Sequence, residues 1–162
     1  MHKDKCSLKI RLIVFDIDGV ITDGTVQVDE FGHEYKRFCL NDIDALNQLS
    51  REGYVLAAIT GESNQIADYI SRKVPWKYFV KGCKEKLRAF QSILREEGYM
   101  LDETAYIGDG LYDVPVLKHV PNSICPANAV PEAKDASRIV LNCSGGQGCV
   151  VELYEMIKIG LI

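Results

Sequence analysis

Short apolar segments alternate with amphipathic segments along most of this chain, and this alternation limits the possible folds more than any other feature. The expected strands cover about residues 10–15, 54–59, 78–80, 104–107, 122–125 and 138–141. Most are nearly continuous apolar runs, as in strands buried on both faces of a parallel sheet. The sequence therefore predicts an α/β fold with a central parallel sheet between two layers of helices.

Helix signals fill the gaps between these strands. Asn41 or Asp42 can cap a helix that ends near residue 52, and Ser63 can cap the next, which stops at Pro75. Further helices are expected at about residues 83–97 and 114–119, from Pro131 onward, and at about residues 149–159. No repeat or linker interrupts this order, so a single domain over residues 1–162 is expected.

A β-hairpin is expected at about residues 25–39, directly after the first strand. Two alternating segments flank a turn that contains Gly32. Such a hairpin can overhang a site at the end of the first strand as a flap. It can also offer an edge strand to another subunit, or be plain edge decoration.

Composition and charge limit the classes of binding partner that we expect for this chain. The formal net charge of -4 gives no reason to expect nucleic acid or an anionic membrane surface as a partner. No apolar run reaches the length of a membrane span, and the first residues lack the apolar core of a signal peptide. The six cysteines, Cys6 among them, form no Cys-x-x-Cys pair and are expected to be reduced, with Cys39, Cys125 and Cys149 as core side chains. A cytoplasmic protein is expected.

Two aspartates separated by one residue end the first apolar run. Residues two apart in an extended backbone point to the same side, so Asp16 and Asp18 can face one site. Carboxylates about 4 Å apart repel by roughly 4 kcal/mol at an effective dielectric constant of 20, so a cation or a held proton must compensate. The alternative is a strand that runs into an acidic turn without a ligand.

Further polar residues follow other strands and would meet Asp16 and Asp18 at one edge of the sheet. They are Thr60, Gly61, Lys86, Asp109 and Asp113. Ligands of parallel sheets bind beyond the carboxyl ends of the strands. Carboxylates suit Mg²⁺, while a hydroxyl, backbone amides and an ammonium suit phosphate oxygens. The set predicts phosphoryl transfer through an aspartyl-phosphate, although Thr60, Lys86 or Asp113 alone would more often be ordinary cap or surface residues.

These motifs resemble those of the haloacid dehalogenase superfamily, whose members have a Rossmann-like fold. The matching motifs are Asp16-Ile-Asp18-Gly-Val, Thr60-Gly61, Lys86 and Gly108-Asp109-Gly-Leu-Tyr-Asp113. The resemblance covers nearly the whole chain. It implies that Asp16 is the nucleophile and that Asp18 is the general acid and base. It also implies that Asp16, Asp109 and the Asp18 backbone carbonyl hold Mg²⁺, and that Thr60, Gly61 and Lys86 hold the phosphate, with Asp113 in support.

A closer resemblance is to the cap-less phosphatases of 3-deoxy-octulosonate and nonulosonate phosphates. The extended motif to Gly24, the hairpin and the Gly-rich turn at residues 145–148 carry it. It implies a sugar-phosphate substrate and a homotetramer in which a neighbouring subunit, not a cap domain, closes each site. Glu62, Tyr112 and Val151 depart from the octulosonate pattern, and no arginine for a substrate carboxylate is evident. Glu62 and Asp42 are candidate substrate-binding residues.

Two other functions compete with this one. A non-catalytic module that assembles a sialic-acid-type cytidylyltransferase would explain the departures, but not why Asp16, Asp18, Lys86 and Asp109 all remain in register. A phosphomutase or phosphonatase has no support, since the chain lacks a cap insertion and a second lysine suited to a Schiff base. The sequence therefore predicts a Mg²⁺-dependent sugar-phosphate phosphatase.

Overall fold

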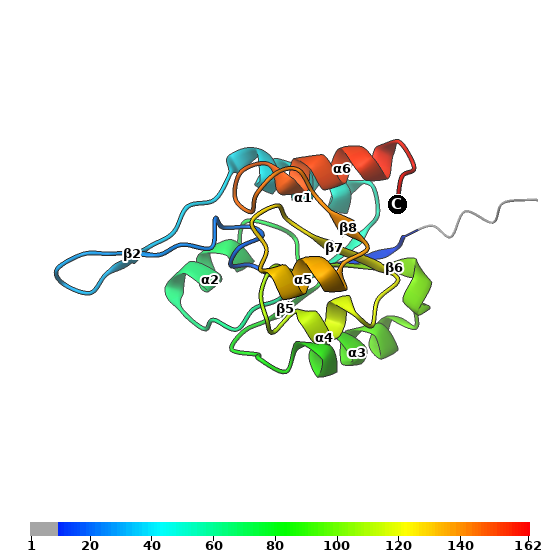
Figure 1. The fold of residues 1–162 in the computed structure, drawn as a ribbon, viewed down its shortest axis with the longest axis horizontal. Helices are drawn as coiled ribbons and strands as arrows, with labels where there is room; N and C mark the ends of the chain where they lie inside the picture. Colours follow the sequence, from blue (N-terminus) through cyan, green and yellow to red (C-terminus); the bar gives the residue numbers. More distant parts are fainter. Residues whose placement is uncertain (1–9) are drawn as a thin grey trace, which may run out of the picture.

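Six parallel strands form one central sheet in the computed structural model, which describes residues 10–162 (Figure 1). The strands are β1 (Leu12–Phe15), β4 (Val55–Ile59), β5 (Tyr78–Val80), β6 (Thr104–Ile107), β7 (Asn122–Cys125) and β8 (Ile139–Val140). Their order across the sheet is β5-β4-β1-β6-β7-β8. β1 pairs with β4 on one side and with β6 on the other, so Phe15 lies between Ala58 and Ile107. The strand order reverses at β1 and β6, where such sheets open a crevice for ligands.

Helices cover both faces of the sheet and confirm the three-layer prediction (Figure 1). The helices are α1 (Leu40–Arg51), α2 (Gln65–Ser71), α3 (Lys86–Glu97), α4 (Val114–Leu117), α5 (Pro131–Ala136) and α6 (Cys149–Lys158), with a 3₁₀ turn η1 (Leu101–Glu103). α1, α2 and α6 share one apolar core with Ile13 and Phe15 of β1. α3, α4 and α5 share the other with Leu12 and Val14. Because successive strand residues point to opposite faces, a strand between two cores must be apolar throughout.

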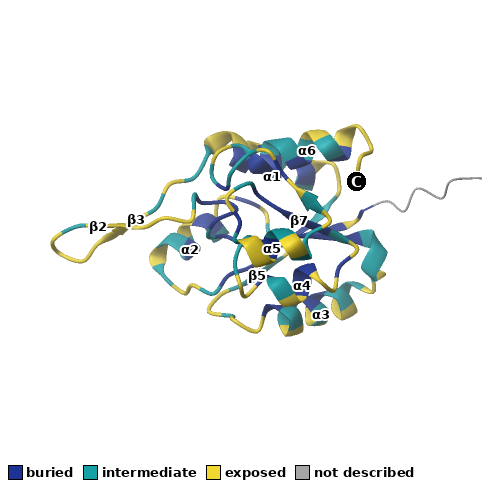
Figure 2. Ribbon diagram, viewed as in Figure 1, coloured by how far each residue is buried: buried dark blue, intermediate teal, exposed yellow. Residues whose placement is uncertain are grey.

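The hairpin that follows β1 extends away from the body of the molecule (Figures 1 and 2). Its strands β2 (Gln27–Val28) and β3 (Glu34–Tyr35) are shorter than the alternating pattern suggests. Asp29 orders the turn by accepting hydrogen bonds from the backbone N–H groups of Phe31 and His33. Nearly the whole hairpin is exposed, so within the described residues its side chains do not pack into the apolar cores of the sheet.

Three helices begin at other positions than the sequence suggests. α1 starts after Cys39, because the Asp42 carboxylate binds amides of α6 instead of capping its own helix. The cap of α2 is Asn64, whose Oδ1 accepts from Ala67 N at 3.0 Å, and not Ser63. α3 starts at Lys86, because Cys83 N donates to Thr60 O and thus joins the loop after β4.

The cysteines of the described region are free thiols. Cys125 and Cys149 are buried as expected, whereas Cys39 is only partly buried because it precedes α1 at the surface end of the hairpin. Cys6 lies outside the described residues. Within residues 10–162, no helix is long and apolar enough to cross a membrane.

Candidate active site

Asp16 is the first residue after β1, at the point where the strand order reverses. Its backbone N–H donates to Ile107 O, and this hydrogen bond fixes Asp16 beside the end of β6. The residue is only 5% exposed, and Oδ1 accepts from Ile17 N at 2.7 Å and from Lys86 Nζ at 2.8 Å. Burial raises the pKa of Asp16 well above its usual value, and the charge of Asp113 adds to this, while Lys86 opposes it. Asp16 is therefore a buried carboxylate at the end of β1, and its ionised form needs a positively charged neighbour.

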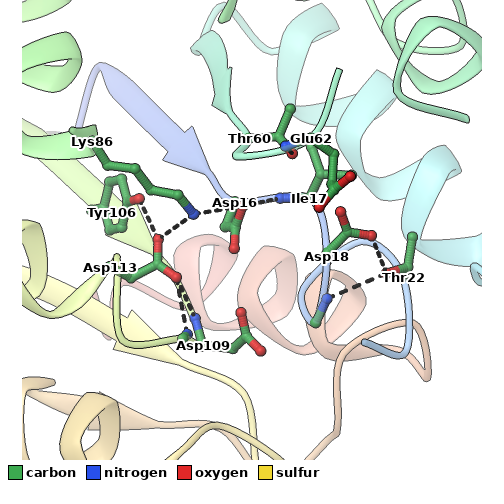
Figure 3. A network of polar contacts seen from close by, with 12 residues as sticks. Asp16, Ile17, Asp18, Thr22, Thr60, Glu62, Lys86, Tyr106, Asp109 and Asp113 are labelled. Carbon is green, nitrogen blue, oxygen red and sulfur yellow. Dashed lines mark hydrogen bonds and ion pairs between the residues drawn. The ribbon is translucent and has the colours of Figure 1, made fainter. Parts of the chain in front are cut away.

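Lys86 links Asp16 to Asp113 from the first turn of α3 (Figure 3). Its ammonium lies 2.8 Å from Oδ1 of each aspartate. Burial lowers the pKa of Lys86, but the two carboxylates outweigh burial and the pKa lies above its usual value. Tyr106 donates to the same Oδ1 of Asp113 at 2.6 Å. Asp113 Oδ2 accepts from the backbone N–H groups of Asp109 and Gly110, so this side chain fixes both the lysine and the loop after β6.

Asp109 follows β6 and faces Asp16 across the crevice (Figure 3). Burial raises its pKa to about 6, with the charge of Asp113 as the second cause. A Cβ at Gly19 would lie 1.9 Å from Asp109 Oδ2, so only glycine lets the loop after β1 come this close. Side-chain oxygens of Asp16, Asp109 and Asp113 lie within 4.8 Å of one another.

This cluster fits a divalent cation. Three carboxylates share one ammonium, which leaves an excess of negative charge in a largely buried place. The oxygens of Asp113 are already used by Lys86, Tyr106 and two backbone amides, so Asp16 and Asp109 are the better ligands. Hard oxygen donors of this kind suit Mg²⁺.

Asp18 follows Asp16 after one residue, Ile17. Its side chain lies on the other side of the crevice from Asp113 (Figure 3). Its Oδ1 accepts from Thr22 Oγ1 at 3.2 Å and from Lys36 Nζ at 2.8 Å. Lys36 directly follows β3, so the hairpin contributes to the position of this carboxylate. The sequence offers no signal for this contact, because only the path of the hairpin brings the two residues together.

A cavity of about 250 Å³ opens beside Asp16 and Asp18. It is lined by Asp16, Asp18, Thr60, Gly61, Glu62, Lys84, Lys86 and Tyr112. Thr60 is buried at the end of β4, and its Oγ1 accepts from Glu62 N at 3.1 Å, which turns the loop around Gly61. The cavity and the acidic cluster share Asp16, and together they contain every candidate residue except Asp42. The sequence motifs do not indicate Lys84 or Tyr106 as site residues. For Lys84, the only signal in the sequence is its position two residues before Lys86.

Asp42 does not line this cavity. It is fully buried, and its carboxylate accepts from the backbone N–H groups of Gly148, Val150 and Val151 at 3.0 Å each. These donors belong to the start of α6, which such a carboxylate stabilises. The geometry is that of a buried helix cap and argues against the predicted contact with substrate.

The Gly-rich turn before α6 supports the loop that carries Asp18. A Cβ at Gly145 would lie 1.8 Å from Gly19 O, and one at Gly146 would lie 2.5 Å from Asp23 N. Gly146 N donates to Val20 O at 2.9 Å. Glycine is therefore required at both positions, where this turn packs on the backbone after β1.

Comparisons with known proteins find relatives of similar sequence and fold. A family model described as haloacid dehalogenase-like hydrolase matches residues 79–152. The 3-deoxy-D-manno-octulosonate 8-phosphate phosphatase KdsC of Yersinia pestis is 30% identical over 148 residues, which cover 91% of this chain and 79% of the relative. Among solved structures, a phosphatase of that name from Moraxella catarrhalis, in complex with magnesium, phosphate and KDO, superposes with a TM-score of 0.89. It is 30% identical, and the match covers 95% of this chain and 89% of that one.

A cobalt-bound deoxy-D-mannose-octulosonate 8-phosphate phosphatase from Haemophilus influenzae superposes with a TM-score of 0.88. It is 29% identical, and the match covers 95% of this chain and 90% of that one. Two such structures hold a divalent metal ion, the ligand type that the acidic cluster fits.

Proposed function

Because the chain belongs to the haloacid dehalogenase-like hydrolase family, we propose that it is a Mg²⁺-dependent phosphatase of sugar phosphates, of the octulosonate or nonulosonate type. The observation that carries this proposal is the position of Asp16, which lies between Lys86 and Asp109 where the strand order reverses. The relatives and the solved structures named above are phosphatases of an octulosonate phosphate. The alternative, a non-catalytic assembly module, has no support from them.

Asp16 is the nucleophile in this proposal. Its carboxylate attacks phosphorus, the bond to the sugar oxygen breaks, and an aspartyl-phosphate forms that water then hydrolyses. Attack requires the ionised carboxylate, which burial disfavours. Lys86, 2.8 Å from Oδ1, opposes that cost and leaves Oδ2 for the attack.

Asp18 is the general acid and base. It donates a proton to the leaving sugar oxygen and later removes one from water, a role worth about 10²–10⁴ in rate. Its hydrogen bonds to Thr22 and Lys36 fix the side chain beside the crevice. It is also less buried than Asp16, as a group that exchanges protons with substrate and water requires.

Thr60, Gly61 and Lys86 hold the phosphate. The Thr60 hydroxyl can donate to a phosphate oxygen while it accepts from Glu62 N, and the Gly61 amide lies at the same cavity wall. Asp113 acts through Lys86, whose ammonium it holds. Tyr106 in turn donates a hydrogen bond to Asp113. Glu62 lines the same cavity and can accept hydrogen bonds from sugar hydroxyls.

Asp16 and Asp109, with the backbone carbonyl of Asp18, would hold Mg²⁺. The ion would neutralise phosphate charge and offset the repulsion between the carboxylates. The excess negative charge of the cluster supports this assignment.

We also propose a single phosphatase domain over residues 1–162, with the hairpin at residues 25–39 as a flap and no separate cap domain. A homotetramer would bring a neighbouring subunit over each open cavity, and the extended hairpin supports such an assembly (Figure 1). The free thiols of the described region fit the cytoplasm as its location.

Phosphate release from a panel of sugar phosphates, with Mg²⁺ and with a chelator, tests the proposal. We expect chelator-sensitive release that Asp16→Asn lowers by about 10³-fold or more while the fold persists. The matched control is Asp44→Asn, the same change at an exposed position of α1. Wild-type activity in Asp16→Asn would overturn the mechanism, and no release from any sugar phosphate would overturn the substrate class.

A further inference from the structure

The cavity that contains Asp16 has two lysines on its wall, and only one of them forms ion pairs. Lys86 is held by Asp16 and Asp113. Lys84, two residues earlier, forms no ion pair with any residue in the range 10–162. Its ammonium lies 5.5 Å from the centroid of the Tyr112 ring, within the range of a cation–π contact. Lys84 is thus a cation that the protein's own carboxylates leave available.

Lys84 and Tyr112 separate the catalytic cavity from a second groove. The groove has a volume of about 410 Å³ and shares Lys84, Lys86 and Tyr112 with the cavity. The catalytic cavity alone, at about 250 Å³, is smaller than the roughly 300–1,000 Å³ typical of small-molecule sites. A substrate whose phosphate lies at Asp16 would therefore extend past Lys84 and Tyr112.

The charges on the cavity wall are unevenly placed. Asp18 and Glu62 lie across the cavity from Lys86 and provide negative charge there (Figure 3). Lys84 also lines the cavity and lies two residues before Lys86, the first residue of α3. A second anionic group of a substrate would be repelled by Glu62 and attracted by Lys84. The exposed face of Tyr112, which is 56% exposed, offers a surface for the C–H groups of a sugar.

We propose that Lys84, held against the Tyr112 ring, binds a carboxylate of the substrate. The pair thereby selects sugar-acid phosphates over neutral sugar phosphates. This inference rests on the proposed function, since the phosphate must occupy the Asp16 end of the cavity.

The test compares kcat/KM for two substrates, 3-deoxy-octulosonate 8-phosphate and glucose 6-phosphate. Lys84→Met should lower the ratio of the two values about fivefold, through KM of the acid, since an exposed ion pair contributes about 1 kcal/mol. Lys84→Arg and Tyr112→Phe keep the charge and the ring and should stay within about twofold of wild type. The control Lys118→Met removes an exposed charge from the end of α4, outside the cavity, and should leave the ratio unchanged.

An unchanged ratio in Lys84→Met, or an equal loss in Lys84→Arg, would overturn the inference. A second measurement needs no turnover: calorimetric binding of the octulosonate phosphate to Asp16→Asn, with and without Lys84→Met. We expect about fivefold weaker binding in the double variant. If wild type releases no phosphate, the proposed function fails, while this binding measurement still decides the role of Lys84. Equal binding by the two variants, or none by either, would contradict that role.

Discussion

At the scale of residues, a single ammonium group holds two carboxylates of the candidate site. Lys86 contacts Asp16 and Asp113 at the same distance, 2.8 Å, and Asp113 is fixed in turn by Tyr106. This chain of contacts joins β6 to α3 and ends at the proposed nucleophile. Burial raises the pKa of Tyr106 well above its usual value, so its hydroxyl stays protonated and acts as a donor.

Tyr106→Phe tests this chain of contacts. The change removes a 2.6 Å hydrogen bond, but Asp113 Oδ1 keeps its contact with Lys86, so no acceptor is left unpaired. We expect the free energy of unfolding to fall by about 1 kcal/mol and kcat to fall by a few fold, with KM little changed. Denaturant unfolding and steady-state kinetics measure both.

The matched control is Tyr154→Phe, which removes a 2.7 Å bond from a tyrosine hydroxyl to Glu52 at the exposed surface. Its kcat should equal that of wild type. An equal kcat in Tyr106→Phe would show that Asp113 and Lys86 hold their positions without Tyr106.

Metal binding should depend on pH through Asp109. Burial raises the pKa of Asp109 to about 6, above the roughly 3.9 of an unfolded aspartate, so the folded protein without metal binds the proton more tightly. That contribution to stability is present below about pH 4 and is lost as the pH rises through about 6. Mg²⁺ competes with this proton, so the metal should stabilise the fold more at pH 7 than at pH 5.

The measurement is the difference in Tm with and without Mg²⁺ at pH 5 and pH 7. We expect a larger gain at pH 7, and little gain at either pH in Asp109→Asn. An equal gain at both pH values in the wild type would mean that the proton on Asp109 does not compete with the metal.

The positions of Asp16, Asp109 and Lys86 in the fold could be predicted, because each lies near the end of a strand or at the start of a helix that the apolar pattern locates. It does not predict the contact of Asp18 with Lys36. That contact joins residues 18 positions apart through a hairpin whose direction no local pattern determines.

At the scale of elements, the buried strands are the most predictable part of this chain. Their apolar runs face two cores, so β5, β6 and β7 have the expected bounds. Helix starts are less predictable, because tertiary contacts compete for the capping groups. Asp42 is the clearest case, since its carboxylate serves α6, more than a hundred positions away, and not α1.

Asp42→Ala tests this assignment. It leaves three buried or partly buried amides at the start of α6 without their acceptor, and we expect the free energy of unfolding to fall by about 2–4 kcal/mol. At temperatures well below Tm, KM should be unchanged. Thermal unfolding and kinetics separate the two effects, with Asp44→Ala, an exposed position on the same helix, as control. A higher KM at unchanged stability would support the predicted contact with substrate instead.

At the scale of the whole molecule, different contacts fix the positions of the sheet and of the hairpin. The sheet places Asp16 and Asp109 side by side because β1 and β6 are neighbours at the reversal of strand order. The hairpin has no such support within the chain, and the sequence left open whether it is a flap, an edge for another subunit or decoration. The hairpin is exposed along most of its length (Figure 2). Its exposed apolar side chains are unusual for a surface that remains in water; they are Val26, Val28, Phe31 and Tyr35.

The last prediction concerns these apolar side chains. If the hairpin packs against neighbouring subunits of a homotetramer, Val28→Asp with Phe31→Asp should lower the mass in solution from about four times the 18.1 kDa chain to one or two chains. Both positions are more than half exposed, so the fold of each chain should persist, while kcat/KM should fall because no neighbour closes the cavity. Light scattering and kinetics measure these effects. Ile159→Asp with Leu161→Asp makes the same change at similarly exposed positions near the C-terminus and should alter neither mass nor activity. A wild-type protein that is monomeric and fully active would leave the hairpin as a flap of its own subunit and contradict the proposed assembly.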